Sequence, residues 1–550
     1  MKGKFYESEY EKALIDLLQA EGWQYTNGGN IHRQLREPLL IEDPKVNDLR
    51  VYLQNQYPDL ADSDVTEVIN YLRHVPGQSH FERLRNTFQL VRDGYRYTRH
   101  GDGVNFDIRF IDFDNTDCNI FRAVNQFEVA YGMKNDVRIP DVLLFVNGIP
   151  LCIFELKNPT KLDADIAQAY EQIHTRYMRD IPHLLRYCPL SCISDATDNN
   201  TRLGTTYTPY EHYYAWKKVN NEDPSAQKGI DQVRTIVKGV HEPSRFLEIL
   251  RDYVYFPDEK SGREEEIVCR YPQFFATRMM SDSIRRAFKE QTSKGGTYFG
   301  ATGCGKTYTM MFIARQLALR CKELGSPTVI MIVDRDDLQT QAGKLFLRSQ
   351  DFLQLGTVKV ISDREELKTE LSLRDSGGFF ICTIQKFCES IGELNTRRNI
   401  ICFSDEAHRT QIRLSSKIKV VEHKDIEAKV EQTSAGAVAV RIIDESKIGA
   451  FVTKPYAEQL RTAFPNATFV GFTGTPIAET IQVFGEIVDR YTMQQAVDDE
   501  ITKDIKYIPR IAQVTLDSEK VKEIEDYYTR CAEEGATESD IAASKKAMSA

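Results

Sequence analysis

Residues 297 to 311 read TYFGATGCGKTYTMM, and this stretch decides the fold of the second half of the chain. The apolar run that ends at Gly300 predicts a β-strand, and the residues from Lys306 onward predict a helix. The turn between them matches G-x-x-x-x-G-K-T, in which backbone amides face a phosphate and the helix start adds positive potential. We expect Lys306 to reach the terminal phosphates of ATP and Thr307 to ligate magnesium. The expected ATP-binding residues of this loop are Gly300, Thr302, Gly303, Gly305, Lys306 and Thr307.

A second apolar stretch, NIICFSDEAHRTQ at residues 399 to 411, ends in acidic residues. Acidic residues at the carboxyl end of a buried strand lie where a doubly wound parallel sheet binds its ligands. We expect Asp405 to hold magnesium, and Glu406 to orient and deprotonate the attacking water, because phosphoryl transfer requires both roles. Taken alone, the tetrapeptide Asp405-Glu406-Ala407-His408 could instead begin a solvated helix. The phosphate loop upstream argues against this alternative.

The alternation of helices and strands predicts the fold class. From Arg245 onward, helical stretches alternate with apolar segments such as VIMIVDR, GGFFICTI and TFVGFTG. This pattern is typical of an α/β domain with a doubly wound parallel sheet covered by helices on both faces. Residues from about 411 to 453 interrupt the alternation with a charged stretch, which we interpret as an insertion.

Another candidate site lies in IPDVLLFVNGIPLCIFELK at residues 139 to 157, which predicts two strands joined by a turn. A two-residue turn would place Asp141 on the face away from Glu155. A three-residue loop, Asn147-Gly148-Ile149, or a bulge with the same effect, would set Asp141 directly against Glu155, with Lys157 on the same face. We predict this second arrangement.

The chemistry of this PD...ExK pattern follows from its charges. Asp141 and Glu155 together can hold a magnesium ion, which lowers the pKa of bound water and stabilises charge on a scissile phosphate. Lys157 would orient or activate the attacking water. The alternative is an exposed hairpin with an ordinary Glu-Lys face. Both acids interrupt apolar runs, where ionised groups need a partner, and this favours the metal site.

Composition limits the class of protein. The chain has 550 residues, 41% hydrophobic and 28% charged, which predicts three or four folding units of a soluble globular protein. Its net charge of -10 shows no overall excess of basic residues for binding nucleic acid, but it does not exclude a local basic groove. It has no apolar run of membrane-spanning length and no signal peptide, so we expect a cytoplasmic location. Its 11 Cys are scattered without CxxC pairs, which indicates reduced thiols and neither a zinc site nor a disulfide framework.

The motifs of residues 270 to 480 resemble those of superfamily 2 helicases and translocases. The segment VDRDDLQTQ resembles the one that touches the nucleic-acid backbone in that superfamily, CTIQKF resembles the next motif, and FTGTP at residues 472 to 476 resembles the one that links hydrolysis to movement. Gln273, in RYPQFF, resembles the glutamine that reads adenine. The residues that carry the first two likenesses are Arg335, Asp337, Gln341, Thr383 and Gln385.

A PD...ExK nuclease followed by such a motor resembles the R subunit of type I restriction-modification enzymes. The likeness extends over nearly the whole chain, through NQFEVA, RYPQFFATR, DEAHRTQ and GFTGTPI. It implies ATP-dependent translocation of double-stranded DNA, Mg2+-dependent endonucleolytic cleavage, and methyltransferase (M) and specificity (S) subunits as partners. It also implies a PD-(D/E)xK nuclease domain at 1–240, a RecA-like helicase domain at 241–485 that contains the insertion, and the start of a second RecA-like domain at 486–550.

The sequence departs from this family in two ways. Family nuclease domains often carry a Gln-x-x-x-Tyr helix after the lysine, but here Gln168 is followed four residues later by Gln172, and Tyr177 comes one place late. The chain also ends where a second motor lobe should begin, so we expect a fragment that turns over ATP poorly by itself. Two further interpretations stay open: a stand-alone ATP-dependent helicase-nuclease of repair or phage defence, and a catalytically silent DNA-binding fragment.

Overall fold

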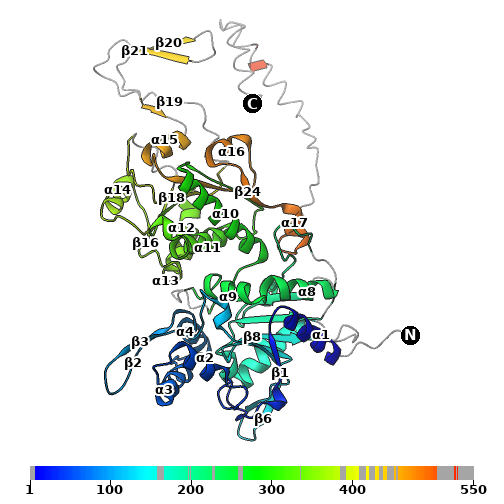
Figure 1. Cartoon of the computed structure of the whole chain (residues 1–550). Helices are drawn as coiled ribbons and strands as arrows, with labels where there is room; N and C mark the ends of the chain where they lie inside the picture. The colour runs from blue at the N-terminus through cyan, green and yellow to red at the C-terminus, as the bar shows by residue number, and fades with distance from the viewer. Residues whose placement is uncertain are drawn as a thin grey trace. The chain divides into compact units, whose positions relative to one another are not determined.

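The structure is a computed structural model (Figure 1). It describes residues 7–157, 166–195, 197, 200–225, 229–257, 264–334, 336–383, 392–407, 417–419, 428–432, 438–442, 451–453, 456–503, 526–527 and 529. The chain divides into two compact units, Met1–Thr502 and Lys503–Ala550, and both sheets of seven strands lie in the first. Within the part of the chain that is described, no helix has both the length and the apolar character needed to cross a membrane.

The amino-terminal part is built on a mixed sheet of seven strands. Two neighbouring pairs, β1 with β4 and β8 with β9, are parallel, and the other neighbours are antiparallel. The strands in spatial order are β1 (Gln24–Asn27), β4 (Phe121–Asn125), β7 (Val142–Val146), β8 (Ile149–Leu156), β9 (Leu190–Ser194), β10 (Thr201–Gly204) and β11 (Tyr214–Ala215). Every residue of β7 and β8 is buried, so these strands form the centre of the sheet.

Two hydrophobic clusters cover the two faces of this sheet. Alternate residues of β8, including Cys152 and Phe154, pack with α1 (Glu7–Ala20), α8 (Gly229–Val240) and α9 (Pro243–Asp252). Ile153 faces the opposite side and packs with α5 (Ile166–Glu171) and the π-helix η3 (Gln172–Tyr177). Further elements of this part are η1 (Gly28–Asn30), α2 (Asp48–Gln56), α3 (Asp62–Arg73), α4 (His80–Asp93), β2 (Tyr95–Thr98), β3 (Asn105–Ile108), η2 (Thr116–Cys118), β5 (Val129–Tyr131), β6 (Asp136–Arg138), α6 (Met178–Asp180), α7 (Pro182–Leu185) and η4 (Tyr210–His212).

The second sheet has seven strands, and all its neighbouring pairs are parallel. Its spatial order is β16 (Val358–Val360), β17 (Phe379–Thr383), β15 (Thr328–Val333), β18 (Ile400–Ser404), β23 (Thr468–Thr473), β14 (Lys294–Gly300) and β24 (Ile487–Tyr491). Because β14 lies between β23 and β24, strands distant in sequence are neighbours here. The predicted α/β class with a parallel sheet is confirmed.

Helices pack on both faces of the second sheet, as the alternation in the sequence predicts. One face carries α10 (Tyr271–Glu290), α11 (Lys306–Leu319), α12 (Asp336–Leu347) and α13 (Gln350–Leu353). The other carries α14 (Arg364–Ser372), α15 (Tyr456–Ala463) and α16 (Ala478–Phe484). Further elements are β12 (Val254–Tyr255), β13 (Ile267–Val268), η5 (Lys322–Leu324) and α17 (Met493–Asp498).

The predicted insertion contributes short antiparallel pairs within its described residues. Strand β19 (Lys417–Lys419) pairs with β22 (Phe451–Thr453), and β20 (Ala428–Gln432) pairs with β21 (Val438–Ile442). Neither pair joins the parallel sheet, which agrees with the interpretation of this stretch as an insertion.

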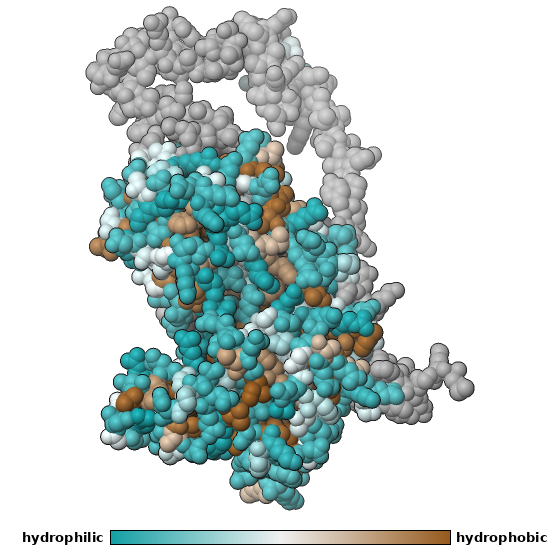
Figure 2. Space-filling view, viewed as in Figure 1, coloured by the Kyte–Doolittle hydropathy of each residue, from teal (hydrophilic) through white to brown (hydrophobic). Residues whose placement is uncertain are grey.

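The surface and the interior of the described chain differ in polarity. On the face drawn in Figure 2, hydrophilic residues predominate and hydrophobic residues form small scattered groups. The large apolar side chains are concentrated in the clusters that cover the two sheets. The hydrophobic effect therefore stabilises the same two sheets that carry the candidate sites.

Candidate active sites

The β7–β8 hairpin has a two-residue turn, so the predicted three-residue loop is wrong. Val146 pairs with Ile149, and both turn residues have positive φ, 50° at Asn147 and 76° at Gly148, as a type I′ turn requires. Gly148 has little alternative, because a Cβ there would lie 2.8 Å from the backbone nitrogen of Leu49. The turn alone would leave the two acids on opposite faces.

A β-bulge one step further along corrects the register, and the alternative prediction is confirmed. Phe145 pairs with Pro150 but Leu144 pairs with Cys152, so one extra residue of β8 is accommodated between them. The bulge lies beside a proline, which cannot donate a hydrogen bond to a neighbouring strand. Val142 then pairs with Phe154, and continuation of this register sets Asp141 against Glu155.

Glu155 is fully buried and has two polar partners. The ammonium of Lys157 donates to Oε1 at 2.7 Å, and the hydroxyl of Tyr177 donates to Oε2 at 3.1 Å. Burial raises the pKa of Glu155 well above its usual range, and the nearby charge of Asp141 raises it further. Asp141 accepts a hydrogen bond from the backbone nitrogen of Leu156 at 2.6 Å. The structure therefore brings the three predicted nuclease residues together.

The π-helix η3 supplies residues that the sequence left unassigned. Gln172 donates from Nε2 to the hydroxyl of Tyr177 at 2.7 Å, and that hydroxyl also lies 3.2 Å from the carbonyl oxygen of Ile139. A π turn contains one more residue than an α turn, so it brings together side chains five residues apart. The late position of Tyr177 is therefore compensated by the backbone, and Gln172 rather than Gln168 makes the contact with it.

The predicted phosphate loop connects β14 to α11. Gly300 ends the strand and Lys306 begins the helix, with Thr307 second in it. Gly305 has φ of 88°, and a Cβ there would lie 2.4 Å from Nε2 of Gln273, which donates to the carbonyl oxygen of Gly305 at 3.4 Å. The left-handed backbone conformation therefore favours glycine at this position, and a Cβ would displace the end of the Gln273 side chain.

Asp405 and Glu406 follow strand β18, which is separated from β14 by one strand, β23. Burial raises the pKa of Asp405 to about 6, with a further contribution from Glu406. Glu406 has φ of 47°, a conformation that is uncommon outside glycine and that often occurs at functional sites. Its Oε1 lies 3.9 Å from the ammonium of Lys306, so the phosphate loop and the acidic pair face each other.

Strand β23 lies between them and brings a third predicted segment to the same edge. A Cβ on Gly474 would lie 3.4 Å from Oγ1 of Thr302 and 3.5 Å from the carbonyl oxygen of Gly300. This contact places the FTGTP segment, residues 472 to 476, against the phosphate loop. Three segments distant in sequence thus meet at the carboxyl ends of β18, β23 and β14.

The side chains of both sites suit the groups that the motifs imply. Asp141 and Glu155 offer carboxylate oxygens, the ligands that Mg2+ prefers. At the second site a lysine and glycines with positive φ suit phosphates, and Asp405 suits a divalent cation. Arg335 and Gln385 lie outside the described residues, as does the side chain of Asp337.

The family comparisons agree with this division into two sites. Residues 4–212 match the family described as type I restriction enzyme R protein N terminus. Residues 272–540 match the family described as SWI2/SNF2 ATPase. The first part of the chain thus resembles the amino-terminal part of a restriction R protein, and the second part resembles a SWI2/SNF2 ATPase.

Curated relatives extend the likeness along the chain. A type I restriction enzyme HindI endonuclease subunit of Haemophilus influenzae is 33% identical over 517 residues, which cover 91% of this chain and 46% of the relative. A putative type I restriction enzyme MjaIXP endonuclease subunit of Methanocaldococcus jannaschii is 26% identical, with 96% of this chain and 49% of the relative covered. A type I restriction enzyme endonuclease subunit of Staphylococcus saprophyticus, SsaAORF53P, is 22% identical, with 95% and 50% covered.

The chain is similar to type I restriction enzyme endonuclease (R) subunits, and the resemblance drawn from the motifs is confirmed. It spans about half the length of the curated relatives it matches.

Proposed function

We propose that this chain supplies the DNA-cleaving site and part of the ATP-driven DNA-translocating motor of a type I restriction enzyme. The observation that carries the proposal is the convergence of Asp141, Glu155 and Lys157 on a bulged hairpin. The same chain holds the phosphate loop opposite Asp405 and Glu406. A nuclease centre and a nucleotide site in one polypeptide allow movement along a duplex to end in cleavage.

In the proposed nuclease site, Asp141 and Glu155 would hold Mg2+. When bound, the ion supplies an activated water and stabilises negative charge on the scissile phosphate. The ammonium of Lys157 donates to Oε1 of Glu155, and it would orient the attacking water. Tyr177, supported by Gln172, is a positioning residue, because its hydroxyl holds the carboxylate of Glu155 from the opposite side.

In the proposed motor site, Lys306 and the loop amides bind the phosphates of ATP, while Thr307 and Asp405 would hold Mg2+. Glu406 orients and deprotonates the attacking water. Gln273 lies against the loop at Gly305, from where it would read the adenine. Full turnover needs a second lobe, because the arginine that stabilises the transition state comes from it in two-lobed motors.

We also propose a division of the chain that follows the two sheets. Residues 1–240 would form the PD-(D/E)xK nuclease domain, and the first RecA-like lobe would begin at 241. Because β24 (Ile487–Tyr491) joins the second sheet, we place the end of that lobe after residue 491 rather than at 485. The stretch expected to begin a second RecA-like domain lies mostly outside the described residues. The proposed partners are double-stranded DNA and the M and S subunits, in the cytoplasm.

The test is cleavage of a circular duplex that carries the recognition site, by the complex reconstituted with its cognate M and S subunits, ATP and Mg2+. Lys157→Ala should abolish cleavage but leave DNA-stimulated ATP hydrolysis unchanged, and Glu406→Gln should remove hydrolysis. The matched control is Lys134→Ala, at an exposed lysine in the turn between β5 and β6. Cleavage by the Lys157→Ala complex at the wild-type rate would refute the nuclease assignment. Cleavage without M and S subunits would favour a stand-alone helicase-nuclease.

A further inference from the structure

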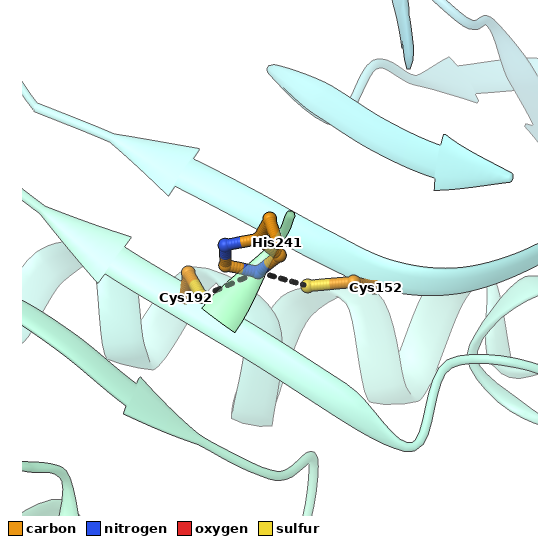
Figure 3. A group of neighbouring side chains, drawn as sticks. All are labelled: Cys152, Cys192 and His241. Carbon is orange, nitrogen blue, oxygen red and sulfur yellow. Dashed lines mark hydrogen bonds between the residues drawn. The ribbon is translucent and has the colours of Figure 1, made fainter. Parts of the chain in front are cut away.

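Two cysteines and a histidine meet inside the amino-terminal part, on the face of the sheet opposite to Ile153 (Figure 3). Cys152 lies in β8, Cys192 lies in the neighbouring strand β9, and His241 directly follows α8. All three side chains are fully buried. Each sulfur lies 3.7 Å from Nε2 of the imidazole. Three metal-binding side chains from three separate elements therefore converge on one point.

The imidazole of His241 is oriented with Nε2 toward the two sulfurs. Nδ1 of His241 lies 3.2 Å from the carbonyl oxygen of Ile236, so Nδ1 carries the hydrogen and Nε2 keeps its lone pair. The carbonyl oxygen of His241 accepts a hydrogen bond from the indole of Trp23 at 2.6 Å, which fixes the backbone of this residue. A backbone carbonyl on the remote nitrogen is the usual second partner of a metal-ligating histidine.

The separations match those around a tetrahedral zinc ion. Zn–S distances of about 2.3 Å and Zn–N distances of about 2.05 Å, at tetrahedral angles, put sulfur and nitrogen about 3.6 Å apart. The two observed Sγ to Nε2 distances are both 3.7 Å, and all three ligand atoms lie within 4.8 Å of one another. The two sulfur-to-nitrogen distances are therefore close to those around a zinc ion.

The charge of the Cys152, Cys192 and His241 ligands favours a divalent ion. Two thiolates and a neutral imidazole carry two negative charges, which Zn2+ neutralises completely. A neutral centre suits the surroundings, because the ring of His241 packs on Phe154 and Phe246, with ring centroids 4.9 Å and 5.6 Å away. A monovalent ion would leave a net charge buried in these apolar surroundings, which is costly.

We propose that Cys152, Cys192 and His241 form a zinc site. Three protein ligands leave a fourth position for a water molecule, since no fourth cysteine, histidine or carboxylate joins the group among the described residues. Sequence spacing predicts no zinc site, because the ligands lie 40 and 49 residues apart rather than in CxxC pairs. Here the tertiary fold, not the local sequence, assembles them.

The proposed ion would fasten the sheet that carries the nuclease residues. It would join the end of α8 to β8 and β9, and Glu155 lies three residues beyond Cys152 in β8, on the other face of the strand. The proposed zinc site is separate from the proposed Mg2+ site, because its ligands lie on the other face of the sheet, and its occupancy does not depend on nuclease activity. Loss of zinc should loosen β8 and β9 before other strands.

The test begins with the metal content of the wild-type chain, purified from cells supplied with zinc and then desalted. Elemental analysis should give about one zinc per chain. Cys152→Ser, Cys192→Ser and His241→Asn should each lose the ion, whereas two controls should retain it. Cys188→Ser removes a buried thiol that bonds instead to the carbonyl oxygen of Pro150, and Asp141→Asn alters only the proposed Mg2+ site.

Cobalt substitution keeps the proposal falsifiable if the variants do not fold. The wild-type chain, stripped of metal and loaded with Co2+, should show thiolate-to-cobalt charge-transfer absorption together with the strong visible bands of tetrahedral cobalt. A wild-type chain that binds less than about a tenth of an equivalent of zinc and shows no such absorption would overturn the proposal. The cluster would then consist of thiols hydrogen-bonded to an imidazole.

Discussion

Replacement of Tyr177 by phenylalanine removes one hydroxyl from the proposed nuclease site and keeps the ring in place. That hydroxyl donates to Glu155, whose side chain is fully buried, and accepts from Gln172. A hydrogen bond to a charged group contributes about 1.5–3 kcal/mol, and water cannot replace it at a buried oxygen. Gln172 is partly exposed and can bond to water instead. We expect the free energy of unfolding to fall by about 2 kcal/mol.

The same change should slow DNA cleavage, because Glu155 loses the group that holds Oε2. If half of the stabilisation also acts in the transition state, the rate falls about fivefold to tenfold. Denaturant unfolding and single-turnover cleavage by the reconstituted complex measure the two effects. The matched control is Tyr95→Phe, since the buried hydroxyl of Tyr95 has no hydrogen-bond partner among the described residues and its loss should cost nothing. Equal stability and equal cleavage for Tyr177→Phe and wild type would refute the role given to the π turn.

Three further changes test other parts of the account. Deletion of the exposed Arg176 should convert the π turn to an α turn and keep Tyr177 beside the carboxylate of Glu155. The free energy of unfolding, measured by denaturant, should therefore change by less than about 1 kcal/mol. A deletion in a regular helix would instead misplace every later side chain. Gly305→Ala should weaken binding of a fluorescent ATP analogue by tenfold or more. Gly303 has φ of 82° but open space around it, so Gly303→Ala should lower the free energy of unfolding only by the backbone strain of about 1–2 kcal/mol. Burial lowers the pKa of His174 to about 4, so the native state binds its proton only at lower pH than the unfolded chain does, and stability falls as the pH drops from 6.5 toward 4. His174→Gln should remove about 2 kcal/mol of the loss between pH 7 and pH 5, and an unchanged pH profile of thermal unfolding would contradict this.

The second half of the fold could be predicted from local signals. Apolar strands that alternate with helices specify a parallel sheet, and the glycines and lysine of the phosphate loop sit at a strand-to-helix turn, as the motif requires. The approach of Glu406 to Lys306 follows from strand order, because acids at the carboxyl end of one strand face a loop at the end of another.

For the β7–β8 hairpin, two local sequence signals predict different registers. The Asn-Gly pair and the requirement that Asp141 meet Glu155 conflict if the ladder is regular, and the sequence did not decide between a longer loop and a bulge. Pro150 was the available signal, because a proline in a central strand favours a bulge at that point. The conflict is resolved one residue beyond the turn.

Two features could not be predicted, because they depend on backbone geometry and distant contacts. The π turn at η3 has no sequence pattern beyond the late position of Tyr177, and only the three-dimensional contact with Gln172 identifies it. The Cys152, Cys192 and His241 cluster depends on the pairing of β8 with β9 and on where α8 ends. Such sites become visible only when the tertiary fold is known.

The most direct test of the central claim is an anomalous difference map from crystals of this chain grown with Mn2+ in place of Mg2+. The account predicts a peak about 2.0–2.4 Å from carboxylate oxygens of both Asp141 and Glu155, with Lys157 beside it. A map with no peak between these two carboxylates at saturating Mn2+ would contradict the proposed nuclease site.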